Sequence, residues 1–306
     1  MINQKPLVSI LCATFNQKDY IAQTIEGFLM QKVNFPIEII IHDDASTDGT
    51  SDIVRKYATE YPDIIKPIYQ KENQYSQHKG LWKNFIYPKA KGKYYAECEG
   101  DDYWTDPNKL QRQVDFLESH PDYSLCVHKA ICFNDKKQAF ESCFPKIHEE
   151  TDFTVKDIIS GGGGFFSTNS MLYKADYQSF ESIWSLCPVG DYPLAIKLAL
   201  KGKVHYFPEI MSCYRSFAKG SWSVRTLCGK DAKEKRSKFI KAMDVFLNAL
   251  DKFTHNHYTK EIKNKIDLNH FKLYWDFKMW NKLKKTSYYK QRTFIGKIKA
   301  FIHCLG

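Results

Sequence analysis

The chain has 306 residues, of which 43% are hydrophobic and 15% aromatic, so it can bury a sizeable core, and extensive disorder is excluded. Its net charge of +10 is concentrated near the C-terminus, because residues 255–306 hold 12 Lys and Arg against 3 Asp and Glu, whereas residues 1–254 hold 33 against 32. This distribution argues against a protein that binds nucleic acid with its whole surface, and we expect no nucleic-acid partner.

The predicted elements of the first hundred residues alternate between strands and helices. Strands are predicted at residues 7–12, 37–41, 64–69 and 93–98, and helices at residues 19–31, 47–61 and 78–89. Strand–helix alternation with short connections predicts an α/β protein with a mostly parallel central sheet and flanking helices.

The second part of the chain contains further predicted strands and helices, and its C-terminal end is predicted to be helical and basic. Helices are expected at residues 107–120 and 191–201, and strands at residues 124–127, 170–173, 204–207 and 210–214. Four glycines at residues 161–164 form either a loop close to a substrate or a flexible linker. From about residue 230 the pattern is helical and basic, so we expect a main domain of residues 1–225 and a helical C-terminal extension of residues 226–306.

Cysteine usage and hydrophobic runs indicate the compartment. The nine cysteines are irregularly spaced and include no Cys-x-x-Cys pair, which indicates free thiols in a reducing environment. Neither a secretory signal peptide nor a run of about 18 apolar residues is recognisable. We therefore expect a cytoplasmic protein.

Polar clusters follow three of the predicted strands. Residues 13–16 (ATFN) follow the first, residues 43–48 (DDASTD) the second and residues 99–102 (EGDD) the fourth. Because the carboxyl ends of parallel strands meet at one edge of a sheet, these clusters should converge on one site.

The acidic pairs in these clusters have a structural and a functional interpretation. Asp101 and Asp102 repel each other unless they are solvated or neutralised, and Mg²⁺ commonly binds one or two carboxylates together with substrate phosphates. A role in starting the next helix is the alternative, although Asp106 supplies a cap of its own. Asp43 and Asp44 precede the residues that can cap the second helix, and a carboxylate there could accept a hydrogen bond from a nucleobase or ribose.

Taken together, four strings resemble the family 2 glycosyltransferases of the GT-A fold in order, spacing and identity. They are VSILCATFN (residues 8–16), DDASTD (43–48), GKY (92–94) and EGDD (99–102), and the resemblance covers roughly residues 6–216. It implies transfer of a sugar from a nucleoside diphosphate sugar, a UDP-sugar, with the help of Mg²⁺ or Mn²⁺. The implied acceptor is a saccharide or lipid-linked saccharide hydroxyl, and the implied setting is bacterial surface polysaccharide synthesis.

The resemblance also implies roles for individual residues at the donor site. Asp102 would coordinate the metal, and Glu99 stands where many members have Asp. The expected donor-binding residues are Ala13, Thr14 and Phe15, which cradle the nucleoside; Asp44, which bonds to the base, supported by Asp43; Asp101 near the ribose; and the basic residues Lys79 and Arg215 near the nucleotide. A plain surface position is the alternative for Arg215.

The catalytic base is expected at Asp191, at the start of the helix predicted from that residue. Many members have Glu-Asp at this position, whereas this chain has Gly190 before Asp191. A single carboxylate near the acceptor suits one displacement with inversion, because hydrolases flank the bond with two. Capping of the helix, with Pro193 in its first turn, is the alternative role for Asp191.

Two other functions and two roles of the basic tail remain open. A nucleotidyltransferase would normally show a phosphate loop rich in Gly and Lys, and a sugar-nucleotide-binding protein without activity would not need Asp191. In the tail, Phe294, Ile295, Ile298 and two further apolar residues, Phe301 and Ile302, recur at helical spacing. This helix could contact the inner face of a membrane peripherally, or it could pack on the catalytic domain.

Overall fold

The computed structural model describes residues 5–77, 80–177 and 181–305 and divides the chain into two compact units. The first unit consists of Met1–Phe153, Gly164–Gln178 and Leu198–Val224, and the second of Thr154–Gly163, Ser179–Lys197 and Arg225–Gly306. The second unit therefore contains two segments that precede the extension of residues 226–306 predicted from the sequence.

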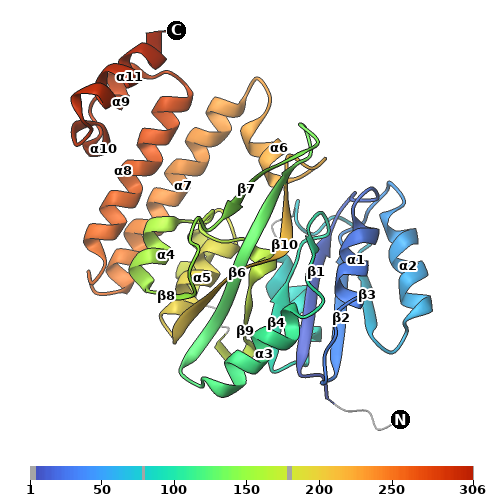
Figure 1. The fold of residues 1–306 in the computed structure, drawn as a ribbon. Coiled ribbons are helices and arrows are strands. Elements are labelled where there is room, and N and C mark those ends of the chain that lie inside the picture. Colours follow the sequence, from blue (N-terminus) through green and yellow to red (C-terminus); the bar gives the residue numbers. More distant parts are fainter. Residues whose placement is uncertain (1–4, 78–79, 178–180, 306) are drawn as a thin grey trace. The chain divides into compact units, whose positions relative to one another are not determined.

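The first unit is built on a ten-stranded sheet, shown with its covering helices in Figure 1. Strands β1, β2, β3 and β4 pair in parallel, and so do β6 and β10, whereas β9 is antiparallel to both β4 and β6. The sheet order is β3 (Ile65–Tyr69), β2 (Ile37–Asp43), β1 (Val8–Thr14), β4 (Tyr94–Glu97), β9 (Leu172–Lys174), β6 (Tyr123–Asn134), β10 (Lys203–Ser216) and β5 (Tyr103–Trp104), with β7 (Ala139–Phe144) beside β6 and β8 (Thr151–Phe153) beside β10. The predicted α/β class with a mostly parallel sheet is confirmed.

The core lies between the sheet and its helices. Strands β1 and β2 are buried along almost their whole length, which explains their nearly continuous apolar sequences. Helix α1 (Ile21–Leu29) buries Ile21, Ile25 and Phe28, and helix α3 (Lys109–Ser119) buries Leu110, Val114 and Leu117. Helix α2 (Thr50–Glu60) contacts α1 and β3, where it buries Val54. These apolar stripes recur every three or four residues, as the sequence predicted.

Some predicted elements differ in the structure. The two strands expected at residues 204–207 and 210–214 are one strand, β10, whose register shifts between Phe207 and Ile210. Pro208 lies at this irregularity, which is where a sheet tolerates the missing N–H of proline. The helix expected at residues 78–89 is a π-helical turn, Trp82–Ile86, followed by a 3-10 turn, Tyr87–Lys89.

The second unit is helical. Its long helices α7 (Ala232–Phe253) and α8 (Thr259–Asp276) contact each other, and short helices α9 (Trp280–Leu283), α10 (Ser287–Lys290) and α11 (Phe294–Leu305) follow (Figure 1). Helix α4 (Val155–Gly161) packs on α8, and the 3-10 segment Ser182–Leu186 packs on α7, which explains why both belong to this unit. Helix α6 (Trp222–Leu227) crosses the boundary between the units. Among the described residues, none of the helices combines the length and apolar composition needed to cross a bilayer.

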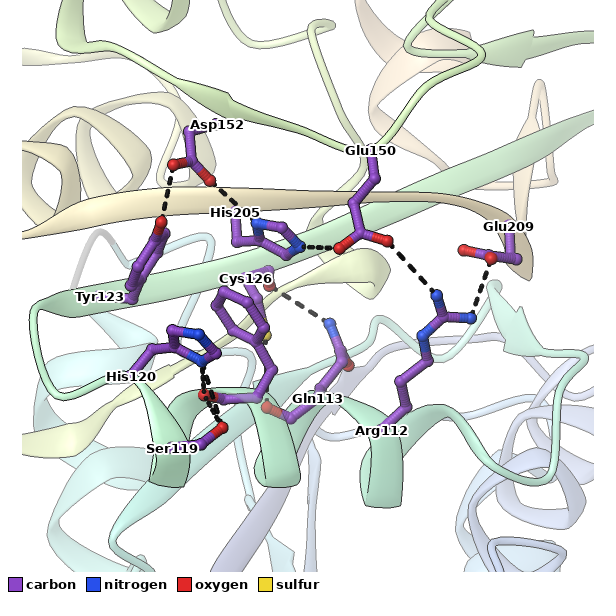
Figure 2. A network of polar contacts seen from close by, with 11 residues as sticks. Arg112, Gln113, Ser119, His120, Tyr123, Cys126, Glu150, Asp152, His205 and Glu209 are labelled. Carbon is purple, nitrogen blue, oxygen red and sulfur yellow. Dashed lines mark hydrogen bonds and ion pairs between the residues drawn. The ribbon is translucent and has the colours of Figure 1, made fainter.

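A polar network ties α3 to strands β8 and β10 within the first unit (Figure 2). The ring of His205 stacks on Phe116 with the ring centroids 3.9 Å apart. Its Nδ1 lies 2.9 Å from Asp152 and its Nε2 lies 3.0 Å from Glu150, so the ring can donate to both carboxylates only when both nitrogens are protonated. Arg112 of α3 extends the network through ion pairs with Glu150 and Glu209.

Candidate active site

Strand β1 brings the three polar clusters together at one edge of the sheet. The carbonyl oxygen of Thr14 accepts a hydrogen bond from the backbone N–H of Asp44, and that of Ala13 accepts one from Gly100, each at 3.0 Å. These contacts join the ends of β2 and β4 to the end of β1 on its two sides. The convergence expected from the order of the strands is therefore present in the first unit.

The loop after β1 is held by its neighbours. Thr14 is buried, Ala13 is half-buried and Phe15 is 38% exposed. A side chain at Gly100 would lie 2.6 Å from the hydroxyl of Thr14, so glycine is needed where the two loops approach. Asn16 adopts a left-handed conformation with a φ of 51°, and its side chain accepts a hydrogen bond from the backbone N–H of Thr47 at 2.8 Å.

The two aspartates after β2 are both buried and have different partners. Asp43 accepts hydrogen bonds from the backbone N–H of Ser46 and the hydroxyl of Ser51, so it organises the turn that leads into α2. Asp44 accepts one from the backbone N–H of Gln74 at 2.7 Å and one from that of Tyr75 at 2.9 Å. Each carboxylate oxygen of Asp44 thus already has one backbone donor, from residue 74 or 75.

Asp102 of the acidic cluster is buried and accepts a hydrogen bond on each carboxylate oxygen. One of its oxygens accepts a hydrogen bond from the backbone N–H of Arg215 at 2.7 Å, and the other accepts one from the side-chain amide of Asn169 at 2.9 Å. Burial, followed by the nearby charges of Asp101 and Glu99, raises the pKa of Asp102 well above its usual range. This arrangement favours a positive charge next to the cluster.

Arg215 is buried beside this cluster rather than lying on the surface. Its guanidinium donates hydrogen bonds to the carbonyl oxygen of Asp101 and to the side chain of Gln23, and it stacks over Tyr103 at 4.5 Å from the ring centroid. These contacts hold the backbone of the acidic cluster. Any contact with a diphosphate would use the remaining N–H groups of the same guanidinium.

Asn169 belongs to the site although the sequence analysis did not identify it. It is fully buried in the 3-10 turn Thr168–Ser170. Its amide donates to Asp102 and to the carbonyl of Cys213, and its side-chain oxygen accepts from Ser167 and Ser212. Its backbone carbonyl accepts from the indole of Trp104 at 2.9 Å. No sequence signal marks it, because its partners are more than forty residues away along the chain, apart from Ser167.

The cluster fits a cation only if the substrate completes the coordination. Within the described part of the chain, no three His, Cys, Asp or Glu side chains lie close enough to hold a metal ion by themselves. Mg²⁺ is often bound by one or two carboxylates with phosphate oxygens as further ligands. A carboxylate oxygen can accept more than one partner, so the hydrogen bonds from Arg215 and Asn169 are compatible with a cation bound to Asp102.

Asp191 lies in the second unit, at the start of α5 (Asp191–Ala199). One carboxylate oxygen accepts a hydrogen bond from the backbone N–H of Tyr192 at 2.8 Å, and burial raises the pKa of Asp191. Both carboxylate oxygens lie 3.8 Å from the position that a side chain would take at Gly163, so Asp191 borders the glycine-rich segment. The other expected site residues belong to the first unit, except Lys79, which lies outside the described residues.

Lys265 of α8 also contacts the glycine-rich segment, a contact that no local sequence pattern predicts. Its amino group donates hydrogen bonds to the carbonyls of Ser160 and Gly161 at 3.2 and 2.8 Å, where α4 ends. Burial lowers the pKa of Lys265 to about 8. Gly162 follows with a φ of 77°, and a side chain there would collide with Lys265. The segment is therefore held by α8 and is not a free linker.

Comparisons with known proteins identify relatives of the chain. The family model described as "Glycosyl transferase family 2" matches residues 9–176. The uncharacterized protein Rv1520 of Mycobacterium tuberculosis is 37% identical over 218 residues, which cover 70% of this chain and 60% of the relative. The Escherichia coli protein named UDP-Glc:alpha-D-GlcNAc-diphosphoundecaprenol beta-1,3-glucosyltransferase WfaP is 40% identical over 113 residues, which cover 37% of this chain and 42% of WfaP.

The fold is shared with a solved structure. The crystal structure of Staphylococcus aureus TarS in complex with UDP-GlcNAc superposes with a TM-score of 0.62 at 16% identity, covering 97% of this chain and 79% of the TarS chain. At this identity the likeness concerns the fold alone. The chain spans about 60% of the length of Rv1520 and less of WfaP.

Proposed function

Because the chain belongs to glycosyl transferase family 2, we propose that it moves a sugar from a UDP-sugar to an acceptor hydroxyl in the synthesis of a bacterial surface polysaccharide. The name of WfaP, which gives UDP-glucose as donor and a diphosphoundecaprenol-linked sugar as acceptor, supports this choice of substrates. The UDP-GlcNAc bound to TarS, which has the same fold, also supports a UDP-sugar.

One observation carries the proposal. Asp44 and the cluster of Asp101 and Asp102 follow different strands, and the backbone hydrogen bonds of Thr14 and Ala13 on β1 bring them to one edge of the sheet. Binding of a nucleoside diphosphate sugar requires two groups at this edge. One recognises the base, and the other binds a cation next to the diphosphate. Their convergence supports a donor site in the first unit.

In this proposal, each expected residue has a role at the donor. Ala13, Thr14 and Phe15 contact the nucleoside, and Asp44 bonds to the base while Asp43 keeps the turn in place. Asp101 lies near the ribose, and Asp102 holds Mg²⁺ or Mn²⁺. When bound, the cation would neutralise the charge that develops on the departing diphosphate. The remaining residues, Lys79 and Arg215, are proposed to assist with the phosphates.

We assign Asp191 as the base. The hydrogen bond from the backbone of Tyr192 orients its carboxylate, and its raised pKa makes it a better proton acceptor near neutral pH than an ordinary aspartate. It would take the proton of the acceptor hydroxyl while that oxygen attacks the anomeric carbon. One displacement of this kind inverts the anomeric configuration.

A panel of UDP-sugars tests the proposal by release of UDP with and without Mn²⁺, using a mixture of lipid-linked and soluble saccharides as acceptors. Asp191→Asn should lower kcat about a hundredfold or more and leave UDP binding unchanged. Asp52→Asn, at an exposed position on α2, is the matched control and should keep full activity. Full turnover in Asp191→Asn would refute the assignment of the base. Binding of UDP-sugars without any transfer would favour a sugar-nucleotide-binding protein.

A lipid-linked acceptor would require the enzyme to work at the cytoplasmic face of a membrane. We propose such a location.

A further inference from the structure

Helix α11 is fixed to the second unit by one of its faces. Ala300 is fully buried and forms an apolar cluster with Phe271 of α8 and Leu283 of α9. The ring of His303 stacks on Trp275 at a centroid distance of 4.3 Å, and its Nε2 lies 3.1 Å from the carbonyl oxygen of Trp275. Small and aromatic residues therefore pack this face of α11 against the second unit.

The other face of α11 leaves five large apolar side chains wholly or partly exposed, and one of them, Phe301, also contacts Trp280 of α9 with the ring centroids 5.0 Å apart. We call them the apolar stripe, and their exposed fractions are 78% for Phe294, 66% for Ile295, 43% for Ile298, 42% for Phe301 and 62% for Ile302. Their spacing of three or four residues places them on one side of the helix. A single exposed apolar residue is ordinary, but a contiguous row of them marks a surface that binds something.

The segment that carries the apolar stripe is basic, and the acidic side chains next to it belong to α8, where Asp267 accepts hydrogen bonds from the backbone N–H groups of Ser287 and Tyr288 and Asp276 pairs with Arg236. Residues 277–306 contain eight Lys and Arg and neither Asp nor Glu. Those that are exposed include Lys284, Lys285, Lys290 and Lys299. A second copy of the chain docking through the same face would bring two such positive regions together, so self-association through the apolar stripe is disfavoured.

From this combination we infer that α11 lies in the surface of an anionic lipid bilayer. The apolar stripe would enter the boundary between headgroups and acyl chains, and the lysines around it would face the lipid phosphates. A helix of 12 residues with this charge can lie in the interface, and it does not meet the requirements for crossing the membrane. The inference rests on α11 and its neighbours alone and does not depend on which sugar is transferred.

Cosedimentation of the full chain with vesicles tests the inference without any activity assay. The vesicles contain phosphatidylcholine with or without phosphatidylglycerol, and the protein should bind the anionic ones and lose binding in high salt. Ile295→Ser/Ile302→Ser removes the two isoleucines of highest exposure without changing charge or much helix propensity, and it should weaken binding about a hundredfold. Lys284→Gln/Lys285→Gln should weaken it about 25-fold, or fivefold for each charge.

Two matched controls make the result decisive. Val245→Ser replaces a 57% exposed valine on α7, and Lys56→Gln removes an exposed lysine of the first unit, and both should bind as the parent does. Absence of binding to anionic vesicles, or equal binding by Ile295→Ser/Ile302→Ser and Val245→Ser, would overturn the inference. So would a change of oligomeric state in the stripe variant without a change in vesicle binding, because the stripe would then join two copies.

Discussion

Replacing Asn169 with leucine tests whether this buried amide supports the acidic cluster. The two side chains have the same number of non-hydrogen atoms and the same branching, so the change leaves no cavity and removes the hydrogen bonds of the amide. The carboxylate of Asp102 loses a donor at 2.9 Å and the carbonyl of Cys213 loses one at 3.0 Å, while Ser167 and Ser212 lose their common acceptor. All four partners are buried, so water cannot easily replace the amide.

The loss of stability follows from these contacts. A hydrogen bond to a charged group contributes about 1.5–3 kcal/mol, and a buried carbonyl left without a donor costs about 1–3 kcal/mol. The serine hydroxyls can rotate toward other acceptors and should add little. We therefore expect Asn169→Leu to lower the free energy of unfolding by about 3–5 kcal/mol. Because Asp102 also loses its orientation, Mn²⁺ binding in the presence of UDP should weaken at least about tenfold.

Urea unfolding measures the first effect, and isothermal titration with Mn²⁺ and UDP measures the second. Asn248→Leu, on the exposed side of α7, is the matched control and should change stability by less than about 0.5 kcal/mol. A loss below about 1 kcal/mol in Asn169→Leu, together with unchanged Mn²⁺ affinity, would refute the role assigned to this residue.

Three further predictions concern residues of the first unit. Burial lowers the pKa of Lys109 from 10.5 to about 7, so between these pH values the unfolded chain binds a proton that the folded chain does not. The parent should therefore gain up to about 1 kcal/mol of stability per pH unit from pH 7 to 9, and urea titrations of Lys109→Met should lack this gain. Gly92→Ala places a Cβ 2.5 Å from the backbone nitrogen of Ser9 and should cost about 1–3 kcal/mol in the same assay, whereas Gly164→Ala, which meets open space, should be nearly neutral. Thr24→Val removes the hydroxyl whose one proton is shared between the carbonyls of Gly100 and Asp102, so it should lower the free energy of unfolding by about 2 kcal/mol and reduce the thermal midpoint; an unchanged midpoint would contradict this.

Much of the proposed donor site at the sheet edge could be predicted from local sequence. Strands β1, β2 and β4 are short, nearly continuous apolar runs, and each is followed at once by polar residues. Parallel strands end at one edge, so local pattern and simple geometry were enough to bring Asp44 and Asp102 into one region. The same reasoning predicted α1, α2 and α3 from the spacing of their buried residues.

Contacts between segments that are distant in the chain could not be predicted from local sequence pattern. Asn169 meets Asp102 only because β9 enters the sheet antiparallel between β4 and β6, and Lys265 meets Gly161 only because α8 packs on α4. Arg215 could be a surface or a site residue by sequence, and the partners that bury it lie more than a hundred positions earlier.

Helix α11 also shows the difference between what the sequence determined and what only the packing decided. Its periodicity predicted an amphipathic helix, because a row of apolar residues recurs every three or four positions. Which face is buried depended on the neighbours: Phe271 and Leu283 pack against Ala300, and Trp275 stacks on His303, whereas from the larger apolar row Phe301 contacts Trp280. Sequence determined that a helix with an apolar side forms here, whereas only the packing of α8 and α9 decided that this side stays exposed.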